Sequence, residues 1–123
     1  MNIQQAIDRH NALKPNQRTD AEKIAWLSTV DGIIFEEIIK THEGGEGIEF
    51  HGYGHDTPLT TELLVPAPYD DIYRFCLDMQ VDLANAEFQK YNNDLMLYNA
   101  ALLAYSDYYN RHHMPIPKTK LKL

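Results

Sequence analysis

The sequence predicts a mainly α fold, a small bundle of about four helices formed by residues 1–123 as one domain. Four segments repeat apolar residues every three or four positions, which is the helical period. A long middle arm, residues 44–68, interrupts them and holds five of the six glycines and three of the six prolines. Strictly alternating apolar and polar residues, which would favour strands, are confined to short runs in that arm.

The composition is that of a globular chain with an acidic surface. Hydrophobic residues are 44% of the total, and 18 acidic residues oppose 11 basic ones, for a net charge of −7. An acidic body repels phosphate, which argues against nucleic-acid binding. Cys76 is the single cysteine, so we expect a small buried hydrophobic residue and no internal disulfide. We expect neither a membrane span nor a secretory signal.

The first two helices have clear sequence limits. Ile3, Ala6 and Ile7 begin an apolar stripe over residues 3–13, and Pro15 disfavours continuation. Thr19 and Glu22 form a Thr-x-x-Glu capping box, in which each side chain accepts a hydrogen bond from a backbone N–H of the first turn. We therefore expect a second helix from about residue 20 to residues 41–42, just before the glycines of the arm.

The arm is predicted to be irregular, with two strand-like runs at residues 48–51 and 62–65 that leave a small hairpin open as an alternative. A connection of about 25 residues inside a small domain is unusual and is often functional. We expect this arm to become ordered against a partner.

The third and fourth helices are expected to share the last third of the chain. Asp70 or Asp71 is predicted to cap the third helix, whose core stripe includes Leu83 and Ala86, while Asp78 and Asp82 face away. A break is expected at residues 91–93, followed by a fourth helix that ends before residue 114. Its inward stripe is Leu95, Tyr98, Leu102, Tyr105 and Tyr109. Residues 116–123 form a basic tail, either a flexible end or a strand added to a partner.

No arrangement of residues predicts catalysis. The best metal candidates are His51, His55 and Asp56 in the arm, to which His42 could be added, but their spacing matches no specific metal signature. Glycine-rich residues 44–47 lack the lysine of a phosphate loop. We therefore expect a protein without enzymatic activity and without a cofactor.

Tyrosines point instead to protein contacts. Seven of the eight lie at residues 69–109, more than one small core can hold, and tyrosine is enriched in interfaces. The alternative for each tyrosine is a place at the rim of the core. Our candidates for interface residues come from the fourth helix, the arm and the tail: Tyr98, Tyr105, Tyr108, Tyr109, Phe50, Tyr53, Lys118, Lys120 and Lys122.

Motifs along nearly the whole chain resemble, in order, those of one protein family. In the first half of the chain the motifs are Lys14-Pro15-Asn16-Gln17, Asp20-Ala21-Glu22-Lys23-Ile24, Trp26-Leu27, Asp31-Gly32 and Thr41-His42-Glu43. In the second half they are Pro66-x-Pro68-Tyr69-Asp70, Tyr91-Asn92-Asn93, Tyr98-Asn99 and Tyr108-Tyr109-Asn110-Arg111-x-His113-Met114-Pro115. The family is that of the small head–tail connector proteins (head-completion or neck adaptor proteins) of tailed phages and prophages of Gram-positive bacteria. His112 departs from the threonine expected there.

The resemblance implies a helical, non-enzymatic virion component that forms a ring of about twelve copies under the portal. Its partners would be itself, the portal protein and the next neck or tail protein, in a virion neck assembled in the bacterial cytoplasm. DNA would pass through without specific binding, because twelve copies at −7 carry about −84.

Two alternatives remain. One is a small phage-derived regulatory or inhibitor protein that binds one partner through its tyrosine-rich helices. The other is a metal enzyme built on the arm histidines.

Overall fold

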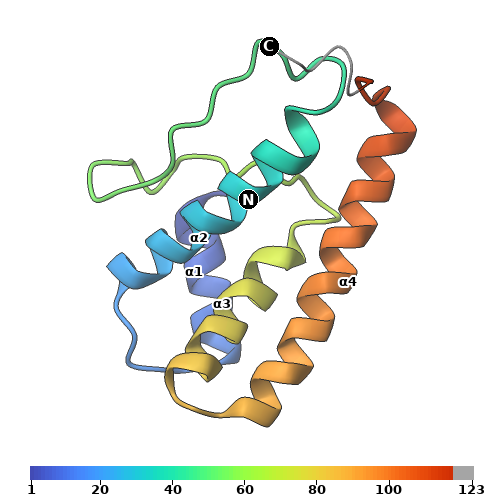
Figure 1. Ribbon diagram of the computed structural model, residues 1–123. Coiled ribbons are helices and arrows are strands. Elements are labelled where there is room, and N and C mark those ends of the chain that lie inside the picture. The colour runs from blue at the N-terminus through green and yellow to red at the C-terminus, as the bar shows by residue number, and fades with distance from the viewer. Residues whose placement is uncertain (118–123) are drawn as a thin grey trace.

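The computed structural model describes residues 1–117 and confirms the mainly α fold. Figure 1 shows the helices in chain order and the arm, in green, that joins α2 to α3. Within the described residues there are four α-helices, one π-helical segment and no strand: α1 Ile3–Leu13, α2 Asp20–Ile34, η1 Phe35–Ile39, α3 Asp71–Ala84 and α4 Phe88–His112. The hairpin that the sequence left open is therefore not formed; Asn2 and Glu62 make only an isolated bridge.

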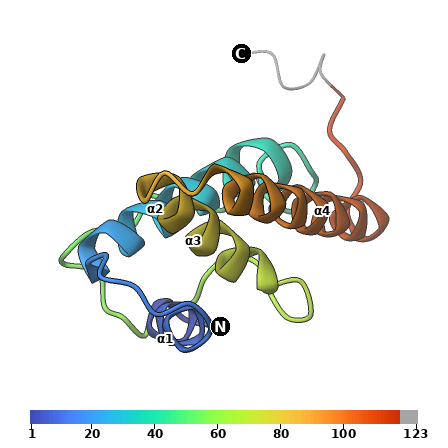
Figure 2. The ribbon, with the colours of Figure 1, turned by 90° about the horizontal axis from the view of Figure 1, so that it is seen from below.

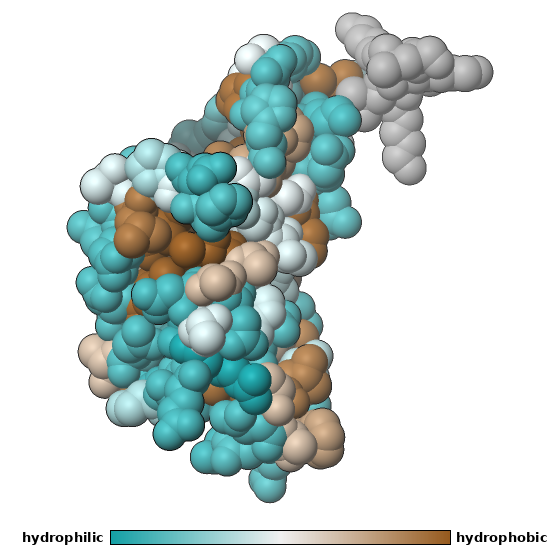
Figure 3. All heavy atoms as spheres, turned by 90° about the vertical axis from the view of Figure 1, so that its left-hand side faces the viewer, coloured by the Kyte–Doolittle hydropathy of each residue, from teal (hydrophilic) through white to brown (hydrophobic). Residues whose placement is uncertain are grey.

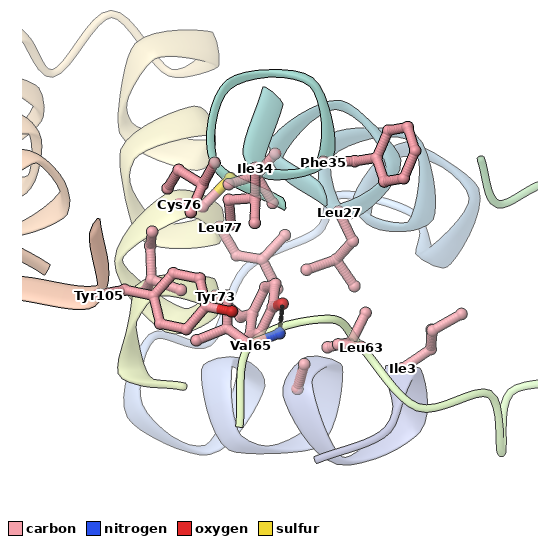
Figure 4. Close-up of a cluster of buried hydrophobic side chains, with 14 of the residues drawn as sticks. Ile3, Leu27, Ile34, Phe35, Leu63, Val65, Tyr73, Cys76, Leu77 and Tyr105 are labelled. Carbon is pink, nitrogen blue, oxygen red and sulfur yellow. Dashed lines mark hydrogen bonds between the residues drawn. The ribbon is translucent and has the colours of Figure 1, made fainter. Parts of the chain in front are cut away.

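Helix α3 is the centre of the bundle. It packs against α1, α2 and α4, and Figure 2 shows it between α1 and α4. The core gathers around it, with Ile3, Leu27 and Leu77 fully buried (Figure 4). Each such side chain contributes roughly 1.5–3 kcal/mol by leaving water. Cys76 is buried among these residues, as predicted.

Capping boxes begin both N-terminal helices. The predicted box is confirmed: Glu22 N donates to Thr19 Oγ1 at 3.1 Å, and Thr19 N donates to Glu22 Oε1 at 3.1 Å. Helix α1 has a second box, made by Asn2 and Gln5, which the sequence analysis did not identify. Both boxes satisfy backbone donors that the helix itself leaves unpaired.

The expected long second helix changes its winding near its end. After Ile34 the chain continues as η1, where Lys40 N donates to Phe35 O at 2.9 Å. Phe35, Ile38 and Ile39 are buried along this segment. The predicted helix therefore continues beyond Ile34, with a π winding that the sequence did not indicate.

The predicted break between the last two helices is wrong by about one and a half turns. The chain turns at residues 85–87, where Ala86 has a positive φ of 57°, and Asn92 and Asn93 lie inside α4. Leu83 and Ala86, predicted to be in the core, are exposed. Asparagine disfavours a helix only weakly, so packing of α4 against α3 outweighed it.

The arm packs on its own chain, which corrects the prediction that it waits for a partner. Ile3 N donates to Thr61 O at 3.1 Å, and Leu63 N donates to Met1 O at 3.0 Å. Leu63 and Val65 are buried in the core (Figure 4). The second half of the arm is thus part of the domain, while the exposed stretch around Asp56 projects from it.

Hydrogen exchange should divide the arm into two parts. The amides of residues 63–65 are expected to exchange at least about 100-fold more slowly than those of residues 55 and 56, because the former are bonded to buried groups. Amide exchange on the isolated chain, read by NMR or mass spectrometry, measures this. Equal, fast exchange throughout residues 44–68 would restore the original expectation that the arm is ordered only by a partner.

Candidate protein-interaction surfaces

A buried carboxylate anchors the arm to the bundle. Asp31, on α2, accepts hydrogen bonds from Tyr53 OH at 2.5 Å, Tyr73 OH at 2.6 Å and Leu64 N at 3.1 Å. Val65 N in turn donates to Tyr73 OH at 2.7 Å (Figure 4). Burial raises the pKa of Asp31 in spite of these hydrogen bonds, and burial beside Asp31 raises the pKa values of both tyrosines.

The first candidate surface is an apolar hollow between α2 and the arm that the anchor holds in place. Its volume is about 340 Å³, and most of its lining is apolar. Helix α2 contributes Ala21, Ile24 and Ala25, and the arm contributes Tyr53 and Leu59. Figure 3 shows this side of the molecule, where brown apolar side chains gather in a hollow that polar side chains surround. We call it the α2–arm hollow.

The second candidate surface is an apolar stripe on the outer face of α4. Met96 and Leu103 are exposed by 71% and 63%, and Leu97 is also exposed. The exposed Ala100 and Ala104 continue the same helical spacing of three and four residues. We call these five residues the α4 stripe. Only the inward face of α4 was predicted from the sequence; this outer face was missed, although its spacing of three and four residues is visible there.

Two of the predicted interface tyrosines are core residues. Tyr105 and Tyr109 are only 3% and 7% exposed, so they offer no surface to a partner in this conformation. Tyr98 and Tyr108 are partly exposed and pack against the core. Burial raises the pKa values of Tyr98 and Tyr105 to about 12. These four tyrosines pack between α4 and the rest of the bundle. A place at the rim of the core was the alternative given for each tyrosine from the sequence.

The two arm candidates are placed beside the bundle. The rings of Phe50 and Tyr53 meet edge to face at 5.2 Å, and Phe50 lies 6.1 Å from the ring of Phe35. Gly52 between them has a φ of +83°, and a Cβ there would lie 2.9 Å from Ser28 Oγ. Tyr53 is therefore held at the edge of the α2–arm hollow, where part of its ring is accessible.

The arm histidines are not assembled into a metal site. His51 pairs with Glu49 at 3.2 Å, and His55 pairs with Asp56 at 3.1 Å, all of them exposed. His42 is buried elsewhere, hydrogen-bonded to Asn110 Oδ1. Among residues 1–117 no group of three or more potential ligands comes together.

A polar cluster at the other end of the bundle was also missed. His10 Nδ1 lies 2.6 Å from Asp78 Oδ1, and Lys14 Nζ lies 3.0 Å from both carboxylate oxygens of Asp82. Asp78 and Asp82 were predicted to face away from the core but are buried, because His10 on α1 and Lys14 at its C-cap supply hydrogen-bond partners. Burial and the neighbouring Asp82 raise the pKa of Asp94 to about 7. The cluster ties α1, α3 and α4 together.

The tail candidates Lys118, Lys120 and Lys122 lie outside the described residues. The chain just before them is held in place, since Ile116 N donates to Thr41 O at 2.8 Å.

Comparison with protein-family models, with curated proteins and with solved structures finds no match. No helix within residues 1–117 has the length and apolar character needed to cross a membrane.

Proposed function

We propose that this chain is a structural, non-enzymatic component of a tailed-phage neck that joins the portal to the tail. Two things support the proposal: the motifs that resemble the small head–tail connector family lie in order along nearly the whole chain, and the fold is mainly α, as that resemblance implies. In this role the copies form a ring that extends the DNA channel.

The observation that carries the proposal is the presence of two different apolar surfaces on opposite sides of one small domain. Figure 1 places α4 along one side and the N-terminal part of α2 with the arm along the other. A ring of identical subunits needs head-to-tail contacts, and each subunit then buries two different patches. The α4 stripe and the α2–arm hollow are two distinct apolar surfaces of this kind.

The charge of the chain fits a channel through which DNA slides. A ring of about twelve copies would carry about −84, so carboxylates that face the channel would repel the phosphate backbone. Binding of DNA along the channel wall would hinder packaging and ejection. The proposed channel therefore works by repulsion, and sequence-specific contacts to DNA play no part in it.

The second candidate is a small phage-derived regulatory or inhibitor protein. The α4 stripe alone favours it, because one continuous helix face suits a single partner's groove. This candidate needs no second surface, and it predicts a complex of one or two copies with one host or phage protein.

The first test is to sequence the DNA on both sides of the gene, followed by native mass spectrometry with the portal protein encoded there. Portal and capsid genes upstream, tail genes downstream and a portal complex with many copies of this chain are the expected results. Regulators or metabolic enzymes as neighbours would overturn the connector proposal in favour of the small binding protein.

A double substitution in the α4 stripe should show whether this stripe, and not the exposed surface in general, contacts neighbouring subunits. Met96→Asp with Leu103→Asp is expected to reduce the number of copies retained on the portal at least tenfold, because both side chains are exposed and would place charges in the subunit contact. The matched control is Leu13→Asp, since Leu13 is 61% exposed on α1, away from both surfaces. Equal retention of control and double variant would remove the stripe from the proposed contact.

A further inference from the structure

The α2–arm hollow has the features of a site for a short extended segment. Ala21, Ile24, Ala25 and Leu59 line it, so it can bury small aliphatic side chains. Asp20 also lines it, and exposed Asp56, which pairs with His55 at 3.1 Å, directly follows that lining residue. An occupant that fits must therefore present apolar side chains on one side and positive charge on the other.

One segment of this chain has that pattern. Residues 118–123 read Lys-Thr-Lys-Leu-Lys-Leu and lie outside the described residues. Alternate residues of an extended segment point to opposite sides, so Leu121 and Leu123 would share one side and the three lysines the other. Extended segments bound by a partner use this alternation, with alternate side chains filling pockets.

The distribution of charge favours the same pairing. Three of the 11 basic residues are in residues 118–123, which leaves eight in residues 1–117 together with all 18 acidic residues. The body without the tail thus carries −10 and the tail +3. Opposite charges draw such surfaces together and fix their orientation.

The tail of a chain is too short for the hollow of the same chain. The hydrogen bond from Ile116 N to Thr41 O holds the start of the tail at the far end of α2 and η1. Ile24 lies 17 residues before Thr41 along this helical segment, about 25 Å away at 1.5 Å per residue. Five extended residues from Ile116 to Leu121 span at most about 18 Å. Leu121 of a chain therefore does not reach Ile24 of the same chain, and Leu123 spans about 25 Å only at full extension. Both leucines can lie in the hollow only when the tail comes from another copy.

We infer that residues 118–123 of each copy bind in the α2–arm hollow of the next copy, with Leu121 and Leu123 on its apolar floor and the lysines toward Asp20 and Asp56. This contact is head-to-tail, the kind that closes into a ring, and in this respect it rests on the proposed function. It names the hollow as the receiving surface and the basic tail as the segment that each subunit supplies.

Disulfide trapping between two single-cysteine variants tests the contact on the chain alone. A mixture of Ala25→Cys and Leu121→Cys chains should form the mixed dimer at least tenfold faster than a mixture of Ala12→Cys and Leu121→Cys chains. Ala12 is the matched control, because it is equally small and lies exposed on α1. Native Cys76 does not compete, since burial raises the pKa of its thiol to about 12. Intact mass identifies each dimer.

Either of two results overturns the inference. Equal rates for the two mixtures would mean that the tail has no preference for the hollow. An internal disulfide in the monomer of the double variant Ala25→Cys/Leu121→Cys would mean that the tail reaches its own hollow. Because the portal is absent, a negative result here combined with a portal-bound ring would reject this contact and leave the connector proposal intact.

Charge reversal gives an independent reading. Lys120→Glu with Lys122→Glu, introduced into the Leu121→Cys chain, is expected to abolish the preference for Ala25→Cys. Asp56→Lys in the receiving chain should restore at least half of it. Unchanged trapping by the reversed tail would show that the lysines do not recognise the acidic edge, and the inference would fail.

Discussion

Replacing Asp31 by alanine is expected to lower the free energy of unfolding by about 3–5 kcal/mol. The carboxylate accepts hydrogen bonds from Tyr53, Tyr73 and Leu64, and each donor would be left without a partner in a buried place. A domain of this size is stable by only about 5–15 kcal/mol, so the variant would be close to unfolding. The arm would be released first, because two of the three donors, Tyr53 and Leu64, belong to it.

Urea unfolding followed by circular dichroism measures the loss, and amide exchange at residues 63–65 tests the release of the arm. The matched control is Asp107→Ala, since Asp107 is exposed on α4. A change below about 1 kcal/mol, similar to that of the control, would show that the Asp31 hydrogen bonds are replaced by water at little cost. Tyr53→Phe offers a milder second variant, which removes one donor and leaves the carboxylate in place.

Replacing Asp94 by asparagine is expected to stabilise the chain by about 1–2 kcal/mol at pH 8 and to remove a pH dependence between about pH 4 and 7. The pKa of Asp94 is raised to about 7, first by burial and then by Asp82. Because the pKa is higher in the folded than in the unfolded state, the folded chain holds the proton more tightly. The stability that this proton contributes is present at low pH and is lost as the pH rises through about 7.

The direction follows from the geometry of the polar cluster. When protonated, Asp94 donates a hydrogen bond to Asp82; when ionised, it places a second negative charge beside it. Lys14 offsets only part of this repulsion, since it already binds both oxygens of Asp82. Asparagine resembles the protonated acid at every pH. The magnitude allows for solvent screening around a partly exposed side chain.

Urea titrations of both proteins at pH 5, 6.5 and 8 give the comparison. The quantity to read is the difference in unfolding free energy between wild type and variant at each pH, because it cancels the contributions that the two proteins share. Asp8→Asn, exposed on α1, serves as the control for loss of one surface charge. If the difference in unfolding free energy between wild type and variant is the same at all three pH values, Asp94 is ionised throughout. That result would contradict a proton held between Asp94 and Asp82.

The chain's own local signals determined where most helices begin and which segment is irregular. Thr19 and Glu22 specify the start of α2 through hydrogen bonds within four residues, and glycines and prolines confine the arm to residues 44–68. The inward stripe of α4 was also readable, because Tyr98, Tyr105 and Tyr109 recur at the helical period. These features depend on neighbours along the chain, and for that reason they are visible in the sequence.

Tertiary structure decided the features that depend on residues far apart in the chain. Asp78 and Asp82 look like surface residues of α3 until α1 brings His10 and Lys14 to them. The arm reads as a loose loop until Asp31 on α2 accepts its donors. The α2–arm hollow likewise depends on distant segments, since Tyr53 donates to Asp31 on α2 and Gln4 N on α1 donates to Leu59 O. Buried polar groups need partners, and those partners come from distant segments that no local pattern can announce.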